Sequence, residues 1–224
     1  DPSVNVANIA RNKGIEVIGE LFSSELAKRI KKEYGQASVI TVTNVFAHIN
    51  DLHDFFKATD ILLKEDGIIC IEAPNLVTLI ENLEYDTIYH EHLSYLSLKP
   101  LRDFCKKVHM DIFNVEFHDI HGGSFRYFFG REKLRKITEN VPKYIQLEEE
   151  KGIYTKSRLE KFALDVKNQK RELNSLLWNL KKEGKKIVGI SAPAKGNALT
   201  NYCKIGPDLL DYVTELNPLK IGKF

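Results

Sequence analysis

The segment 84–95 holds the densest group of side chains that could carry out proton transfer. It reads Glu-Tyr-Asp-Thr-Ile-Tyr-His-Glu-His-Leu-Ser-Tyr, and so places imidazole, phenol and carboxylate groups within a few residues of one another. An imidazole has an ordinary pKa of about 6.5 and therefore accepts a proton readily at neutral pH. The pattern favours a general acid–base cluster, and the alternatives are a His-x-His metal site and an ordinary surface loop.

If this segment is extended, its side chains alternate between two faces. Tyr89 and Glu91 would then share one face, and His90 and His92 the opposite one. A metal ion bound by the two imidazoles would have Glu91 pointing away from it and no evident third ligand in the neighbouring sequence. The sequence therefore predicts no metal at this position.

Two further polar segments follow strand-like runs. Asn44 and His48 come just after the apolar run 37–43, either as a hydrogen-bonded pair at a strand end or as two side chains of a pocket. The segment 189–197, Gly-Ile-Ser-Ala-Pro-Ala-Lys-Gly-Asn, matches neither the P-loop nor a complete dinucleotide-binding pattern. A turn of small residues that carries one lysine and leads into a helix suits a phosphate or carboxylate group, and an ordinary turn has the same pattern.

Helix and strand signals alternate along residues 3–72, and this alternation predicts an α/β fold with a parallel sheet. Residues beyond the carboxyl ends of such strands line a ligand crevice. The apolar runs 110–117 and 124–129 have a short glycine-containing connection and predict an antiparallel hairpin at the end of the sheet. The other predicted elements are helices at 3–13, 23–34, 51–63 and 99–108, strands at 15–18, 37–43 and 68–72, and a turn at 66–67.

The stretch 131–186 differs in composition from the rest of the chain. Its 16 basic and 9 acidic residues give it a net charge of +7. Within it, residues 156–182 predict a long helix with an apolar stripe and a solvated basic face. A nucleic-acid-binding surface is the more specific alternative to a solvated basic face. Against it, acidic residues interleave with the basic ones and aromatic residues are few. A second α/β unit is predicted to begin near residue 187.

The overall composition excludes several classes of function. Lys+Arg 33 against Asp+Glu 31 gives a net charge of +2, which argues against a dedicated nucleic-acid binder. No apolar run approaches the roughly 18–20 residues of a membrane span, and no signal peptide is evident, so no membrane partner is expected. Three widely spaced cysteines predict neither a disulfide framework nor a zinc site and fit a cytoplasmic protein.

Taken together, five segments of this chain resemble the S-adenosylmethionine-dependent sugar C-methyltransferases, which methylate a carbon of nucleotide-linked keto-deoxysugars. The block Tyr-His-Glu-His at 89–92 is highly specific, and the block Ala-Lys-Gly-Asn at 194–197 moderately so. The other segments are supportive. The five, in order, are residues 1–7, 44–52, 85–95, 122–126 and 192–197.

The resemblance implies a partial class I methyltransferase sheet of Rossmann-like fold, a helical connector and a second Rossmann-like unit. The expected parts are residues 1–130, 131–186 and 187–224, the first and last of them truncated. The cofactor would be S-adenosylmethionine. Zinc is expected only in an N-terminal module of the family that this chain does not match, and the family's acid-x-Gly turn after the first strand is not matched either. No oligomeric state is predicted.

The resemblance also implies roles for individual residues. His92 would be the base that forms an enolate, with Tyr89, Glu91 and His48 orienting the sugar or stabilising the enolate. Asp1 and Asn44 would contact the cofactor, Asp1 at its ribose hydroxyls. The turn of Lys195, Gly196 and Asn197 would face the diphosphate or sugar of the substrate. Two alternatives stay open: a methyltransferase acting on another small molecule, and a non-catalytic nucleotide-binding domain.

Overall fold

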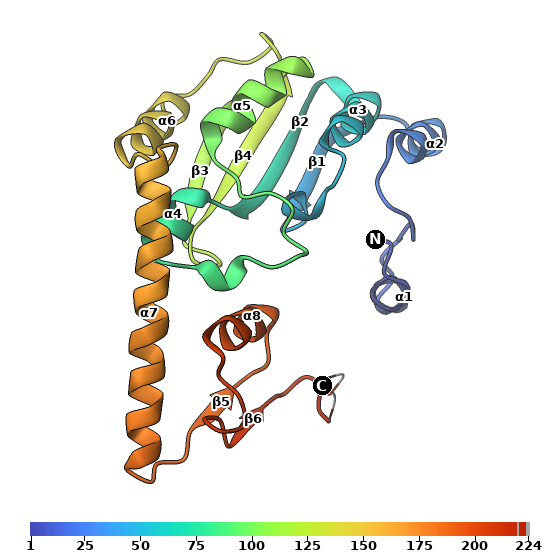
Figure 1. The fold of residues 1–224 in the computed structure, drawn as a ribbon. Coiled ribbons are helices and arrows are strands. Elements are labelled where there is room, and N and C mark those ends of the chain that lie inside the picture. The colour runs from blue at the N-terminus through green and yellow to red at the C-terminus, as the bar shows by residue number, and fades with distance from the viewer. Residues whose placement is uncertain (219, 223–224) are drawn as a thin grey trace. The chain divides into compact units, whose positions relative to one another are not determined.

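The computed structural model describes residues 1–218 and 220–222, which fall into two compact units (Figure 1). The first joins residues 1–74 to 93–147, and the second joins 75–92 to 148–224. Each unit is therefore built from two separate stretches of chain. The boundaries predicted after residues 130 and 186 stay predictions. Leu219, Lys223 and Phe224, at the end of the third predicted part, lie outside the described residues.

A four-stranded mixed sheet forms the centre of the first unit. Its order is β1 (Ala37–Thr43), β2 (Leu63–Pro74), β4 (Ser124–Arg131) and β3 (Met110–His118). β1 and β2 run parallel, whereas β4 is antiparallel to both β2 and β3. The predicted α/β sheet ending in an antiparallel hairpin is confirmed.

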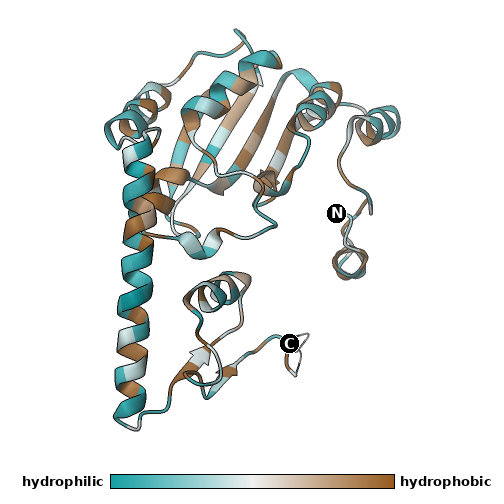
Figure 2. Cartoon of the chain, viewed as in Figure 1, coloured by the Kyte–Doolittle hydropathy of each residue, from teal (hydrophilic) through white to brown (hydrophobic). Residues whose placement is uncertain are grey.

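One face of this sheet is buried against helices. Alternate residues of β4, Phe125, Tyr127 and Phe129, are at most 3% exposed and belong to the main core. Figure 2 shows the hydrophobic stretches of the strands in brown. The helices of this unit are α1 (Val4–Asn12), α2 (Ser24–Tyr34), α3 (Leu52–Leu62) and α5 (Leu98–Lys107), with a 3-10 turn η1 (Phe46–His48). Most of α6 (Asn140–Glu150) also belongs to it, and residues 148–150 belong to the second unit.

Local signals account for where these helices begin and end. The Ser23 hydroxyl accepts a hydrogen bond from the Leu26 N–H at 3.2 Å at the start of α2. The Asp51 carboxylate does the same for the Asp54 N–H at 2.9 Å at the start of α3. Such caps satisfy N–H groups that the helix itself leaves without partners. At the end of α2, Gly35 has φ 82°, a conformation that glycine adopts without strain.

The predicted strand at 15–18 is wrong. These residues form no strand, and the Val17 carbonyl accepts a hydrogen bond from the Arg11 guanidinium at 2.8 Å. A strand needs a neighbouring strand to pair its backbone groups. In the described residues, no strand pairs with residues 15–18.

The predicted turn at 66–67 lies inside β2, which begins at Leu63 rather than at 68. Ala37 pairs with Leu63 but Val39 pairs with Ile68, so residues 64–67 bulge out of the ladder. Gly67 is buried, and a Cβ atom there would lie 2.6 Å from Leu63 Cγ and 3.1 Å from the Lys64 carbonyl oxygen. Only glycine fits this bulge without displacing its neighbours.

Replacing Gly67 with alanine should therefore lower the free energy of unfolding by about 1–3 kcal/mol through overpacking. Urea denaturation followed by circular dichroism measures the loss. The matched control is Gly19→Ala, whose new Cβ would meet the flexible end of Arg11 at 3.4 Å. An equal loss in both variants would contradict a role for close packing at Gly67.

The second unit contains a parallel strand pair joined by a helix. β5 (Val188–Ile190) and β6 (Tyr212–Thr214) pair in parallel, and α8 (Ala194–Cys203) connects them. This agrees with the predicted second α/β unit, whose Rossmann-like character stays a prediction. The long helix α7 (Lys156–Lys182) agrees with the predicted range, and the unit also holds α4 (Leu76–Glu81) and the 3-10 turn η2 (Tyr85–Thr87).

The predicted apolar stripe of α7 packs only in part. Val166 is buried, but Leu159, Leu164 and Leu176 are exposed. In Figure 2 the helix is predominantly teal, interrupted by brown segments. Among the helices of the described residues, none combines the length and the apolar character that crossing a membrane requires.

Candidate functional site

The segment 85–92 folds back on itself instead of running extended. η2 occupies Tyr85–Thr87, and a turn follows in which the His92 N–H donates to the Tyr89 carbonyl at 3.0 Å. The rings of Tyr89 and His92 are 4.4 Å apart between centroids, with an angle of 38° between their planes. The predicted alternation, which put these two side chains on opposite faces, is therefore wrong.

Both ring nitrogens of His92 have hydrogen-bonding partners in this turn. Nδ1 lies 2.7 Å from the Thr87 carbonyl oxygen and 3.2 Å from the Thr87 hydroxyl. Nε2 lies 3.3 Å from the Tyr89 hydroxyl. The imidazole is half-buried, whereas Glu91 and His90 are exposed. The structure thus brings Tyr89 and His92 together, and it adds Thr87, which the sequence analysis did not single out.

The Tyr89 hydroxyl stays protonated at neutral pH. Desolvation raises the pKa of Tyr89, and the negative charges of Glu91 and Asp86 raise it further. A protonated phenol can donate a hydrogen bond to an imidazole nitrogen or to an oxygen that becomes negative during a reaction. Glu91 thus influences this site through its charge.

Tyr85 fixes the start of the segment. Its hydroxyl lies 3.4 Å from Cys203 Sγ, at the end of α8, and its ring meets the Tyr202 ring edge-on at 5.4 Å between centroids. Tyr85 is 7% exposed, and desolvation together with the Cys203 contact raises its pKa, so the phenol remains neutral. This anchor holds η2 against α8.

Asn44 and His48 lie in the first unit, at the carboxyl end of β1. The backbone of Asn44 turns out of the strand with φ 53°, and its N–H donates to the Glu72 carbonyl at 2.9 Å. Left-handed backbone is uncommon outside glycine, and asparagine tolerates it better than most residues. Both side chains are exposed, and His48 ends η1. The predicted position of both residues at a strand end is correct, but their roles stay predictions.

Asp1 is exposed and lies before α1. Its amino group donates to the Ile18 carbonyl at 2.9 Å, and its Oδ1 accepts the Ser3 N–H at 2.8 Å. A carboxylate has acceptor sites on both oxygens, so this local bond leaves Oδ2 able to accept hydroxyl protons. At many dinucleotide sites, the ribose hydroxyls donate hydrogen bonds to a carboxylate in this way.

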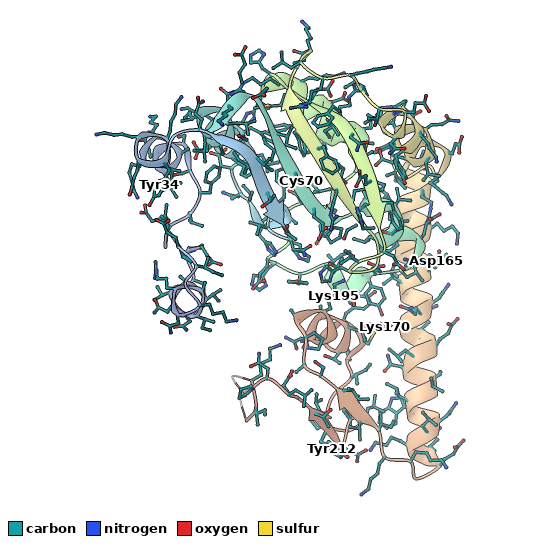
Figure 3. The ribbon with its side chains drawn as sticks, turned by 180° about the vertical axis from the view of Figure 1, so that it is seen from behind. Tyr34, Cys70, Asp165, Lys170, Lys195 and Tyr212 are labelled. Atoms are coloured by element: carbon teal, nitrogen blue, oxygen red, sulfur yellow. The ribbon has the colours of Figure 1, made fainter. Side chains whose placement is uncertain are left out.

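Lys195, which Figure 3 labels, forms the first turn of α8 with Gly196 and Asn197. This turn lies beside a pocket of about 810 Å³. Gly196 and Asn197 line this pocket together with apolar side chains of α7, such as Leu173. Among the described residues, its lysine is Lys220 rather than Lys195. The structure therefore supports a ligand-sized space at this turn but places Lys195 outside its lining.

Two residues that the sequence analysis missed hold the turn before α8. The Glu215 carboxylate accepts the Ala192 N–H at 2.9 Å, and the Lys220 ammonium donates to the Ala192 carbonyl at 3.0 Å. Hydrogen bonds from the N–H groups of Asn217 and Ala192 lower the pKa of Glu215. An acidic residue directly after the second strand of a strand–helix–strand unit is a signal that could have identified it.

The described residues contain no group of three or more His, Cys, Asp or Glu side chains arranged to hold a metal ion. The second unit holds the Thr87–Tyr89–His92 cluster and the pocket at α8, and the first unit holds the polar strand end at Asn44.

Comparisons with known proteins agree on one kind of chemistry. Residues 1–112 match the family described as "Methyltransferase domain", and residues 119–224 match "C-methyltransferase C-terminal domain". The chain is 31% identical over 224 residues to C-methyltransferase NovU of Streptomyces niveus. That match covers 100% of this chain and 53% of the relative, so the chain spans about half the length of this relative.

One solved structure is also similar, a SAM-dependent methyltransferase from Anabaena variabilis ATCC 29413. It is 14% identical with a TM-score of 0.43, and the match covers 59% of this chain and 66% of that one. A likeness at this level carries no weight for function.

Proposed function

Because this chain belongs to the methyltransferase-domain family, we propose that the protein transfers a methyl group from S-adenosylmethionine to a carbon atom. The acceptor in this proposal is the carbon next to the ketone of a nucleotide-linked deoxysugar. The observation that carries the proposal is the imidazole of His92, held in place at both ring nitrogens. The similarity to a C-methyltransferase over the whole chain supports a carbon acceptor.

Methylation at such a carbon requires a base. A C–H bond next to a ketone becomes nucleophilic only after it has lost its proton and its electron pair has spread into an enolate. In the proposal, His92 takes this proton. S-adenosylmethionine, when bound, supplies an electrophilic methyl group to the resulting carbon nucleophile.

In the proposal, Tyr89 assists the same step. Its hydroxyl lies 3.3 Å from His92 Nε2 and remains protonated. In a ketone, the oxygen is two bonds from the α-carbon, so one donor and one base at this separation can serve both atoms. Tyr89 would donate a hydrogen bond to the developing enolate oxygen, which stabilises its charge. Glu91 supports this role by keeping Tyr89 protonated, and His48 is proposed to orient the sugar.

The cofactor contacts are proposed for the first unit. The exposed Asp1 carboxylate offers acceptor oxygens of the kind that ribose hydroxyls need, and Asn44 offers both a donor and an acceptor at the carboxyl end of β1. Ligands of open α/β sheets bind beyond this end of the strands. The polar groups present therefore fit the adenosine part of the cofactor.

The nucleotide-linked part of the substrate is proposed to bind at α8. The pocket of about 810 Å³ is large enough for a ligand of this class. Gly196 and Asn197 line it, and the first turn of the helix favours negative groups such as a diphosphate. Lys195, on the same turn, would attract the diphosphate without lining the pocket itself. Neither nucleic acid nor a membrane is part of this proposal.

The direct test identifies the methylated atom. Full-length protein is incubated with S-adenosylmethionine carrying a ¹³C-labelled methyl group and a nucleotide-linked keto-deoxysugar, and the product is examined by NMR. We expect a labelled methyl group attached to the carbon next to the ketone, and none in a control without enzyme. A methyl group on oxygen or nitrogen would contradict carbon transfer. The absence of any labelled product would favour the non-catalytic alternative.

A further inference from the structure

The contact between His92 and Thr87 determines which ring nitrogen carries hydrogen. A backbone carbonyl oxygen only accepts hydrogen bonds, and the Thr87 oxygen lies 2.7 Å from Nδ1. This contact is a hydrogen bond only in the tautomer whose Nδ1 bears the hydrogen, and the Thr87 hydroxyl at 3.2 Å can accept from the same N–H. A neutral imidazole has one N–H group, so in this tautomer the lone pair of His92 is on Nε2. The 3.3 Å contact to Tyr89 agrees, because the protonated hydroxyl donates to that lone pair.

The Thr87 carbonyl is itself held rigidly. Thr87 is 3% exposed and ends η2, where its N–H donates to the Glu84 carbonyl at 3.2 Å. The next N–H, of Ile88, donates to the Tyr85 carbonyl at 3.0 Å, and Tyr85 is anchored on α8. A carbonyl fixed in this way can orient the imidazole as well as select its tautomer.

We infer that Thr87 is the positioning residue of this site: its backbone carbonyl holds His92 in the Nδ1–H form and makes Nε2 the atom that accepts the substrate proton. The catalytic meaning of this inference rests on the proposed function. The substrate C–H bond breaks, a new N–H bond forms at Nε2, and the electron pair of the C–H bond passes into the enolate. Nδ1 keeps its hydrogen throughout, so the Thr87 carbonyl also stabilises the imidazolium that forms.

Tyr89 occupies the base atom before the reaction. At 3.3 Å its hydrogen bond to Nε2 is long, and so it is readily exchanged when a substrate arrives. The hydroxyl is then released from Nε2 and becomes free to donate to the ketone oxygen. The Tyr89 hydroxyl thus donates to His92 Nε2 in the empty site and to the enolate oxygen in the occupied site.

The test measures the tautomer directly, without cofactor or substrate. Full-length protein is labelled with ¹⁵N-histidine, and the ring nitrogens are observed by NMR at a pH where the rings are neutral. The His92 signals are identified by their loss in His92→Asn. We expect the Nδ1–H form to exceed the other by about tenfold, as one hydrogen bond allows. A dominant Nε2–H form would overturn the inference.

A second variant separates the two partners of the ring. In Tyr89→Phe the Thr87 carbonyl is unchanged, so the Nδ1–H form should persist. A switch to the Nε2–H form would show that Tyr89, not Thr87, selects the tautomer, and would overturn the inference. The tautomer does not depend on turnover: an Nδ1–H ring in a protein that transfers no methyl group would contradict the proposed function but not the placement by Thr87.

Discussion

Replacing His92 with asparagine should slow methyl transfer by about 10²- to 10⁴-fold in the full-length protein, the usual contribution of a general base. The asparagine amide nitrogen can take the place of Nδ1 and keep the bond to the Thr87 carbonyl, but nothing replaces Nε2. The same variant should lose exchange of the substrate's α-hydrogen with solvent deuterium. NMR of the substrate in deuterated water, without methyl transfer, measures that exchange.

The matched control is His109→Asn. His109 is exposed and has φ 59°, a backbone conformation that asparagine tolerates. This variant should keep both methyl transfer and exchange. Retained exchange in His92→Asn would remove His92 as the base, and loss of both activities in His109→Asn would point to damage by the substitution itself.

Replacing Phe56 with alanine should lower the free energy of unfolding of the first unit by about 3–5 kcal/mol. Phe56 is 1% exposed on α3. Its ring lies 5.3 Å from Phe55, 5.8 Å from Phe104 of α5 and 5.8 Å from Phe129 of β4, measured between centroids. The substitution removes the ring that joins two helices to the sheet and leaves a cavity. Urea denaturation followed by circular dichroism measures the effect.

Phe117→Ala serves as the control for that loss. Phe117 is on β3 of the same sheet, is 45% exposed, and contacts the Phe125 ring at 6.0 Å. Because little cavity forms at an exposed position, its loss should be about 1 kcal/mol or less. If both variants lost the same stability, burial of the Phe56 ring would not be the cause.

The sequence predicts those elements whose signals are local. Ser23 and Gly35 mark the two ends of α2, and the range predicted for α7 agrees with the structure. The strand predicted at 15–18 fails for the opposite reason. A strand depends on a partner elsewhere in the chain, and the carbonyl of Val17 is bonded to the Arg11 guanidinium instead. Apolar composition alone does not report such partners.

In the candidate site, too, the sequence predicts local features but not the contacts that depend on the fold. Residue types made His92 and Tyr89 candidates, but their contact depends on a turn that side-chain alternation does not predict. Thr87 acts through a backbone carbonyl, which every residue possesses, so no sequence pattern identifies it. Glu215 had a recognisable position after β6, yet its bond to Ala192 becomes evident only when both ends of the unit are placed.

The anchor between Tyr85 and Cys203 joins residues that are 118 positions apart in the chain. At a synthesis rate of roughly 5–20 residues per second, the ribosome makes Cys203 on the order of ten seconds after Tyr85. The nascent segment 85–92 has no α8 to dock on during that interval. The first unit's sheet, complete at Arg131, can form earlier. The sheet of the first unit can therefore form before Tyr85 meets its contact at the end of α8.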